Sequence, residues 1–239
     1  MKPIAIFQHC QNVQPGHFAS FLDRHSIPWT LVRVDDGNAV PANPDDFSGL
    51  CFMGGPMSVN DDLPWIEQEL DLIRRAVDRD VPVIGHCLGG QLMSRALGGT
   101  VTRNPVREIG WTRITTTDTP HARHWLGDLH AFDAYQWHGE TFSIPASATR
   151  ILEGENCANQ AYVLGPGEGI HLGMQFHIEM TEALIRNWTH EWSREFERNP
   201  LPATTQLPAS QFEQMRAALP AQTAIADRLY TRWIAALSR

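Results

Sequence analysis

The sequence lacks any long hydrophobic run. No stretch approaches the roughly 18 apolar residues that a membrane-spanning helix needs. The apolar residues near the N-terminus, in segment 3–7, are too few for the core of a secretory signal peptide and are soon followed by polar residues. We therefore expect no membrane segment and a cytoplasmic location.

Paired cysteines and excess positive charge are also lacking. Cys10, Cys51, Cys87 and Cys157 show no CxxC spacing, which argues against a disulfide framework in a reducing compartment. At least three of them are expected to be small core residues. The net charge of −8 provides no basic surface for nucleic acid. Hydrophobic residues (42%) and charged residues (19%) are present in the proportions of a packed globular protein.

The first half of the chain contains short apolar runs that alternate with amphipathic stretches. This alternation is typical of parallel βαβ units. Strands are predicted at 3–7, 29–34, 49–53 and 81–84, and helices at 16–25, 64–79 and from Cys87 to about Gly98. The expected fold class is α/β.

The second half is predicted to be richer in strands and loops. Segment 100–173 shows alternating apolar residues and a turn at Gly165-Pro166-Gly167, and Thr181 can cap a following helix. Segment 199–208 is rich in Pro, Ala and Thr, which indicates a linker. We therefore divide the chain into a catalytic domain, 1–190, and a C-terminal linker and helical extension, 191–239.

The extension carries the pattern of an amphipathic helix. Ser210 and Glu213 match a capping box. Apolar residues then recur every fourth position, at Ile225, Leu229, Trp233 and Leu237. Such a stripe must dock on the core of the protein or on another subunit, and a homo-oligomer through this helix remains one of the two alternatives.

The segment around Cys87 has the features of a nucleophile turn. A predicted buried strand meets a predicted helix at Cys87, with Gly85 two residues before it and Gly89 two residues after it. Such a turn exposes a side chain at the end of a strand, and only glycine leaves enough room on either side. A helix N-terminus also favours thiolate over thiol, and the Leu88 N–H could stabilise an oxyanion. The alternative is a buried cysteine between two packing glycines.

His177 and Glu179 follow the last predicted strand. Residues two apart in an extended segment point to the same side, so the two side chains are expected to be neighbours. His177 could act as the base that later protonates a leaving amine, and Glu179 could orient its ring. Taken alone, an HxE pattern is weak, because most histidines at strand ends are structural. The chain order Cys, His, Glu also differs from that of the α/β-hydrolases.

Gly54-Gly55-Pro56 follows the third predicted strand. Two glycines allow backbone N–H groups to approach a ligand closely, and Gly55 could supply a second oxyanion donor. A simple βα turn would have the same composition.

Together the three segments resemble the class I glutamine amidotransferase family of the triad type. The markers of this family are a G-G-P loop, a G-x-C-x-G-x-Q elbow and a distal Q-F-H-x-E. They correspond here to Gly54 to Pro56, Gly85 to Gln91 and Gln175 to Glu179, and segments 108–111 and 136–140 also match. The resemblance covers about residues 1–190.

The resemblance implies a flavodoxin-like, doubly wound, mostly parallel sheet with helices on both faces and a site at the carboxyl ends of the strands. It implies that Cys87 attacks the γ-carbonyl of a small-molecule γ-glutamyl substrate and that water hydrolyses the resulting thioester. By the same analogy, Gln91 and the backbone near Trp137, His138 and Gly139 would hold the amino-acid end. No cofactor is expected.

Departures from the family pattern leave the function open. Ile178 replaces the usual proline between His177 and Glu179. His86 replaces a commoner apolar residue, and we expect its imidazole to find its hydrogen-bond partners within the protein. No synthetase domain is expected after residue 190. The chain could therefore deliver ammonia to a separate synthetase subunit, or it could be a stand-alone γ-glutamyl peptidase. A non-catalytic binding or regulatory module is a third alternative.

A histidine-rich segment offers a weaker candidate site. His121, His124 and His130 lie close together, but no cysteine or carboxylate completes a ligand set. We therefore interpret them as part of a loop face and predict no metal site.

Overall fold

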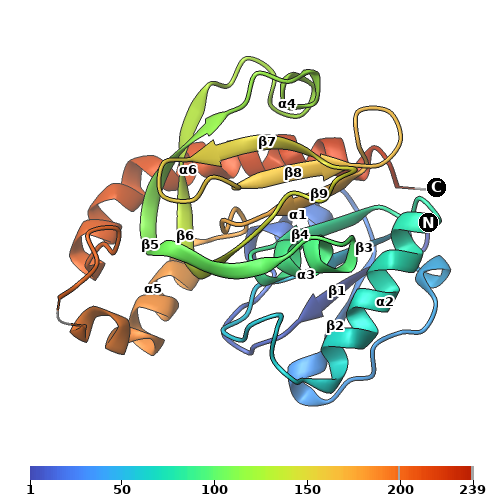
Figure 1. Cartoon of the computed structure of the whole chain (residues 1–239), viewed down its shortest axis with the longest axis horizontal. Helices are drawn as coiled ribbons and strands as arrows, with labels where there is room; N and C mark the ends of the chain where they lie inside the picture. The colour runs from blue at the N-terminus through green and yellow to red at the C-terminus, as the bar shows by residue number, and fades with distance from the viewer. Residues whose placement is uncertain (199, 238–239) are drawn as a thin grey trace.

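A single mixed sheet of nine strands forms the centre of the molecule (Figure 1). The structure is a computed structural model and describes residues 1–198 and 200–237. Its strands are β1 (Ile4–Gln8), β2 (Trp29–Arg33), β3 (Gly49–Phe52), β4 (Val83–His86), β5 (Val101–Thr116), β6 (Ala131–Phe142), β7 (Thr149–Gly154), β8 (Ala161–Leu164) and β9 (His171–Met174). Its α-helices are α1 (Gly16–Arg24), α2 (Pro64–Asp78), α3 (Leu88–Ala96), α4 (Pro120–Leu126), α5 (Glu182–Glu191) and α6 (Pro208–Ile234).

Parallel pairing is confined to one half of the sheet. The strand order is β2-β1-β3-β4-β9-β8-β7-β5-β6. The five strands from β2 to β9 pair in parallel, whereas β9, β8, β7, β5 and β6 pair antiparallel with one another. Because β1, β3, β4 and β9 run in the same direction, the segments that follow them emerge at one edge of the sheet. The predicted Gly54, Cys87 and His177 segments all follow these strands.

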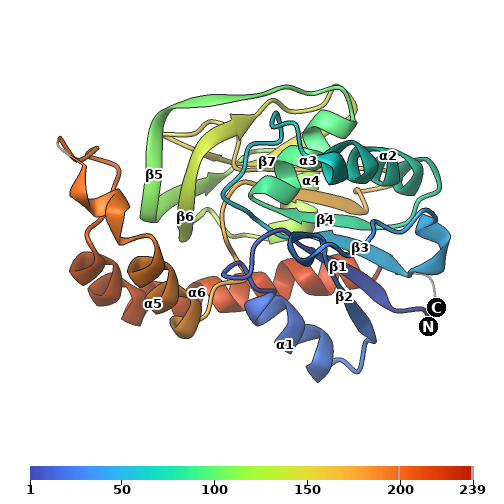
Figure 2. The ribbon, with the colours of Figure 1, turned by 90° about the horizontal axis from the view of Figure 1, so that it is seen from below.

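Helices cover both faces of the sheet (Figure 2), as predicted. Alternate residues of the strands enter opposite hydrophobic clusters: Ile4 and Ile6 pack with α1 and α6, whereas Ala5 and Phe7 pack with α2 and α3. This alternation follows from the two-residue period of a strand. A strand that is apolar at every position therefore indicates two covered faces, and β1 is buried throughout.

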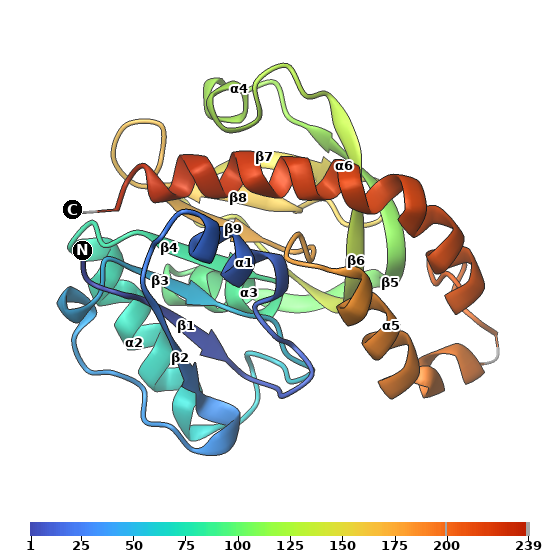
Figure 3. The same cartoon turned by 180° about the vertical axis from the view of Figure 1, so that it is seen from behind.

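The C-terminal helix α6 crosses one face of the sheet (Figure 3). Ile225, Leu229 and Trp233 are buried in the cluster that also contains residues of α1, β6 and α5. The predicted amphipathic stripe therefore docks on the core of the same molecule. α6 is the longest helix, and no helix among the described residues is both long and apolar enough to cross a membrane.

Several local predictions were wrong. α6 begins at Pro208 with Leu207 as its N-cap, so Ser210 lies inside the helix and caps nothing. The predicted linker is partly fixed, because the N–H of Ile109 in β5 donates to the carbonyl of Thr204 and the carbonyl of Ile109 accepts from the N–H of Gln206. Residue 199 of this segment lies outside the described residues. His121 and His124 lie on the short helix α4 rather than on a loop.

Candidate active site

Cys87 occupies the corner between β4 and α3. Its backbone has φ 50° and ψ −104°, a conformation that residues with a Cβ rarely adopt and that is commonly found at functional sites. The N–H of Cys87 donates to the carbonyl of Met174 at 2.9 Å, which ties the corner to the end of β9. The side chain lies at the N-terminus of α3 and is 5% exposed.

The glycines around Cys87 are required by space, as predicted. A Cβ on Gly85 would lie 2.4 Å from the carbonyl carbon of Gly89, and a Cβ on Gly89 would lie 2.0 Å from the carbonyl oxygen of Phe52. Neither backbone neighbour can move without displacing β3 or α3. The helix therefore approaches the sheet closely enough to hold the Cys87 corner rigidly.

His177 and Glu179 lie beside this corner. His177 Nδ1 is 2.7 Å from Glu179 Oε1. The Cys87 sulfur lies near enough to the same ring to raise its pKa. The ring of Trp188 stands perpendicular to the His177 ring, with centroids 4.7 Å apart. The structure thus places Cys87, His177 and Glu179 side by side.

The physical reason offered for the His177–Glu179 pairing was wrong. β9 ends at Met174, and residues 175–179 form bends and a turn rather than an extended strand. Ile178 between them is fully buried in the core, which orients the turn. The two side chains meet because the turn brings them together, and not because of strand alternation.

Charge and burial act in opposite directions on this pair. Burial lowers the pKa of His177, but the negative charge of Glu179 and of the Cys87 sulfur, with hydrogen bonds to both, raises it to about 10. Burial raises the pKa of Glu179, but the charges of His177 and His86 outweigh it and lower that pKa. The arrangement therefore favours a protonated imidazole beside the Glu179 carboxylate.

His86 lies behind the Cys87 corner and is fully buried. Its Nε2 is 3.1 Å from the Tyr230 hydroxyl of α6, and burial lowers its pKa. This agrees with the prediction that His86 is satisfied within the protein.

Two backbone N–H groups near the sulfur have no acceptor. The amides of Gly55 and Leu88 donate to no other group in the part of the chain that the structure describes. A Cβ on Gly55 would lie 2.9 Å from Leu88 Cδ2, so the two residues are neighbours. The Gly54-Gly55 loop after β3 and the N-terminus of α3 therefore place two free donors close together.

Cys87 and His177 line a cavity of about 580 Å³. The predicted residues Gln91, Trp137, His138 and Gly139 also line it. Gln91 Nε2 donates to the carbonyl of Glu140 at 3.2 Å and to Gln175 Oε1 at 3.3 Å. The residues predicted to hold substrate therefore border the same space as the sulfur.

The His138 side chain differs from the others in that its imidazole is already paired. Nε2 lies 3.0 Å from Glu108 Oε2, and Nδ1 donates to the carbonyl of Glu140 at 2.9 Å. Glu108, His138 and Cys157 form a buried group whose potential metal-binding atoms lie within 4.8 Å of one another. Burial raises the pKa of Cys157 to about 11, and its sulfur pairs with Thr141 at 3.1 Å. We interpret this group as a structural support for the end of β6, since His138 pairs with Glu108 and Cys157 pairs with Thr141.

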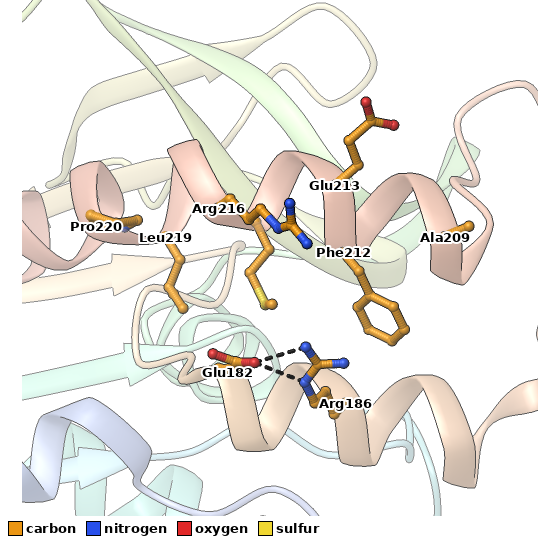
Figure 4. Close-up of a pocket in the computed structure, with 9 residues that line it drawn as sticks. Glu182, Arg186, Ala209, Phe212, Glu213, Arg216, Leu219 and Pro220 are labelled. Atoms are coloured by element: carbon orange, nitrogen blue, oxygen red, sulfur yellow. Dashed lines mark hydrogen bonds and ion pairs between the residues drawn. The ribbon is translucent and has the colours of Figure 1, made fainter.

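A second cavity, of about 750 Å³, lies between α5 and α6 (Figure 4). Glu182 and Arg186 form an ion pair at 2.8 Å on its wall, and Phe212 lies under the guanidinium. The lining of this cavity holds no cysteine or histidine. Its ionisable side chains are two carboxylates and two guanidinium groups, with no thiol or imidazole, so we place the candidate active site at the cavity beside Cys87.

Some groups at this site were not predicted. Gln175 Nε2 lies 3.7 Å from the Cys87 sulfur; it was part of a recognised motif, but nothing in its spacing indicated the contact. Trp192, Arg107 and Arg198 line the cavity, and no local pattern marks them. Gln222 of α6 is fully buried, and its Nε2 donates to the carbonyl of His177 at 3.2 Å.

Comparisons with known proteins agree with this geometry. The family model described as glutamine amidotransferase class-I matches residues 21–187. The glutamine amidotransferase-like protein YfeJ of Salmonella typhimurium is 31% identical over 201 residues, which cover 80% of this chain and 82% of YfeJ. The glutamine-hydrolysing GMP synthase of Vibrio atlanticus is 32% identical over 150 residues, which cover 62% of this chain and 26% of that enzyme.

A solved structure matches the whole chain. The crystal structure of a glutamine amidotransferase from Methylobacillus flagellatus superposes with a TM-score of 0.96 at 43% identity, covering 100% of this chain and 96% of that one. The match includes the C-terminal helix as well as the sheet. By sequence and by structure, the chain belongs to the class-I glutamine amidotransferase family.

Proposed function

We propose that this protein hydrolyses a γ-glutamyl amide through a covalent intermediate on Cys87. The observation that carries the proposal is the contact of a single imidazole, His177, with both the Cys87 sulfur and Glu179 at the wall of a cavity. A thiolate, a proton carrier and an orienting carboxylate are the groups that such acyl transfer needs.

The reaction proceeds in two steps. The Cys87 thiolate attacks the γ-carbonyl carbon, the C–N bond breaks, and the His177 imidazolium gives its proton to the leaving ammonia or amine. Water then loses a proton to His177 and attacks the thioester carbonyl, which releases glutamate and restores the thiolate and the imidazolium. Glu179 holds the tautomer and orientation of His177 throughout, through the bond to Nδ1.

The negative oxygen formed in both steps requires hydrogen-bond donors. We assign this role to the free N–H groups of Gly55 and Leu88, since fixed amide donors lower the barrier most where charge develops. Gln91 and the backbone of 137–139 hold the amino-acid end of the substrate at the cavity wall.

Two forms of this function differ in the fate of the amine. The similarity to part of a glutamine-hydrolysing GMP synthase favours a glutaminase that supplies ammonia to a separate synthetase subunit. The cavity of about 580 Å³, within the range of roughly 300–1,000 Å³ that suits ligands of drug size, favours a γ-glutamyl peptidase. A non-catalytic binding module is the alternative of another class.

The discriminating experiment is a screen for glutamate release. Purified protein and a Cys87→Ala variant are incubated with glutamine, with glutathione and with γ-glutamyl amines. We expect release from at least one of these that depends on Cys87. Turnover of glutamine only after a partner is added would identify the glutaminase form. Substrate binding without any turnover would instead support the binding module.

We predict that Gln222 positions His177. It bridges the Tyr135 N–H, at 2.7 Å, and the His177 carbonyl, at 3.2 Å. Gln222→Ala leaves both groups unpaired, at a cost of about 1–3 kcal/mol each, and frees the His177 backbone to shift. Because a shift of about 1 Å can cost about 100-fold in rate, kcat should fall between about 10- and 100-fold, with KM nearly unchanged.

Gln211 provides a matched control on the same helix. It is also fully buried, accepts from the Tyr135 hydroxyl at 2.7 Å and donates to the carbonyl of Gln206 at 2.7 Å. Gln211→Ala should lower the melting temperature by a similar amount but leave kcat unchanged. Equal losses of kcat in the two variants would show that Gln222 contributes only to stability.

A further inference from the structure

An aromatic wall extends outward from His177 along one side of the cavity. Trp188 stands against the His177 ring, Trp192 lies 5.0 Å from Trp188, and Trp137 lies 5.4 Å from Trp192, measured between ring centroids. All three indoles line the cavity. Large flat side chains at this spacing provide an apolar surface that can hold an aliphatic or aromatic group.

Guanidinium groups lie at the outer end of this wall. Arg107 Nη2 and Arg198 Nε share one carboxylate, Glu195, at 3.1 and 2.8 Å. Arg107 Nε is buried without an acceptor among the described residues. Arg103, also on the cavity wall, is exposed and pairs with no acidic group in the chain from 1 to 198 or from 200 to 237.

The charge of this wall contrasts with that of the whole chain. The protein carries a net charge of −8, yet the cavity lining has three arginines, Arg103, Arg107 and Arg198, against two glutamates, Glu140 and Glu195. Donors remain free on at least two of these arginines. Guanidinium groups of this kind match the geometry of a carboxylate.

The position of His177 decides which part of the substrate meets this wall. The leaving amine takes its proton from His177, so it must lie on the imidazole side of the bond that breaks. Trp188 covers that side of the ring. A group attached to the leaving nitrogen would therefore extend along Trp188 and Trp192 toward the arginines.

We infer that the preferred substrate is a γ-glutamyl dipeptide, whose leaving amino acid has an apolar or aromatic side chain and a free carboxylate. The side chain lies against Trp188 and Trp192, and the carboxylate pairs with Arg103 and Arg107. This inference rests on the proposed hydrolysis at Cys87 and specifies its leaving group.

The residues of this wall come largely from beyond the part of the chain that the family has in common. The matching family model ends at residue 187. Trp188, Trp192, Glu195 and Arg198 follow it, on α5 and on the 3-10 helix Ser193–Glu197 and its end. The apolar surface for the leaving group therefore depends on residues that follow the matched segment, whereas Arg103 and Arg107, which pair with its carboxylate, lie within that segment.

A pair of substrates that differ only in the carboxylate tests the inference. γ-Glutamylphenylalanine and γ-glutamylphenethylamide share the glutamyl group, the scissile amide and the aromatic ring. We expect the protein to hydrolyse the dipeptide with a kcat/KM about 10- to 100-fold higher, the range that charge-assisted hydrogen bonds provide. It should also prefer the dipeptide to glutamine.

Arginine variants connect this preference to the wall. Arg103→Gln combined with Arg107→Gln should lower kcat/KM for the dipeptide by about 10-fold or more and leave that for the phenethylamide nearly unchanged. Arg113→Gln is the matched control, because Arg113 also lies on β5 and makes one exposed ion pair, with Asp133 at 3.4 Å. It should change neither rate.

Each contrary outcome has a distinct meaning. Equal rates of the unmodified protein on the two substrates would overturn the inference and leave Cys87-dependent hydrolysis intact. Equal losses of the double variant on both substrates would place the arginines at the glutamyl carboxylate, which the two substrates share, and would also overturn it. If no γ-glutamyl compound releases glutamate in a Cys87-dependent way, the proposed function fails and the inference fails with it.

Discussion

Cys87→Ala is expected to reduce the release of glutamate from γ-glutamyl substrates by about 10⁴-fold or more, because removal of a covalent nucleophile leaves only the contributions of binding and of the oxyanion donors. Cys87 is the only cysteine among the residues that line the cavity. The loss should appear in kcat and in kcat/KM. The variant should still fold, since alanine removes one sulfur atom from a small, nearly closed site.

Labelling provides an independent measurement of the same prediction. A γ-glutamyl electrophile should form one adduct, and mass spectrometry of the digested protein should locate it on Cys87. Cys51→Ala is a suitable control, because Cys51 is fully buried and lies outside the cavity lining; it should retain both turnover and labelling. Turnover by Cys87→Ala, or an adduct on Cys157 instead, would contradict the mechanism.

The second large effect is expected from Glu179→Gln. The substitution preserves the shape of a fully buried side chain but removes the charge that holds His177 at 2.7 Å. An amide at this position can support the wrong tautomer of the imidazole, and a comparable change in a serine protease lowers kcat by about 10⁴-fold. We expect a loss of about 10²- to 10⁴-fold in kcat, with a much smaller change in KM.

The same variant should alter the pH dependence in one direction. His177 must be protonated to serve the leaving amine, and its pKa is raised to about 10, in part by the charge of Glu179. Activity should therefore persist well above neutral pH and fall as His177 loses its proton. Without the Glu179 charge the His177 pKa falls, so the alkaline limb of kcat/KM must move to lower pH.

The measurement is a profile of kcat/KM from about pH 6 to pH 11 for both proteins. Glu182→Gln serves as the control, since Glu182 is an exposed residue in the first turn of α5 whose ion-pair partner is Arg186. Its profile should coincide with that of the unmodified protein. An alkaline limb that stays in place in Glu179→Gln would mean that Glu179 does not control the protonation of His177.

Much of the fold was predictable because its elements have local signals. β1 is apolar except for its last residue, Gln8, β3 contains only apolar residues and glycine, and α2 shows an apolar stripe after Pro64 at its first turn. These patterns depend only on the periods of strand and helix and on burial, so they are present in the sequence itself. The start of α6 was mispredicted because Pro208 and the capping box compete as start signals, and the proline position prevailed.

The candidate site was predictable where its residues are constrained by their own neighbours. Gly85 and Gly89 must be glycine because the Cys87 corner leaves no space for a Cβ, and this need is visible as a motif. The contact of His177 with Cys87 depends instead on the pairing of β4 with β9, which no local pattern indicates. Only the resemblance to a family linked the two segments in advance.

The amino-acid sequence by itself thus determined the α/β class, the corner that presents Cys87, and the residues proposed to open an amide. The tertiary structure alone decided that α6 supports His177 through Gln222, and that Trp192 and Arg198 share a cavity with the sulfur. The physical reason is the distance along the chain over which each influence acts. Backbone geometry and burial periodicity act between near neighbours in the chain, whereas a cavity wall is assembled from side chains whose meeting depends on the packing of the entire sheet and its helices.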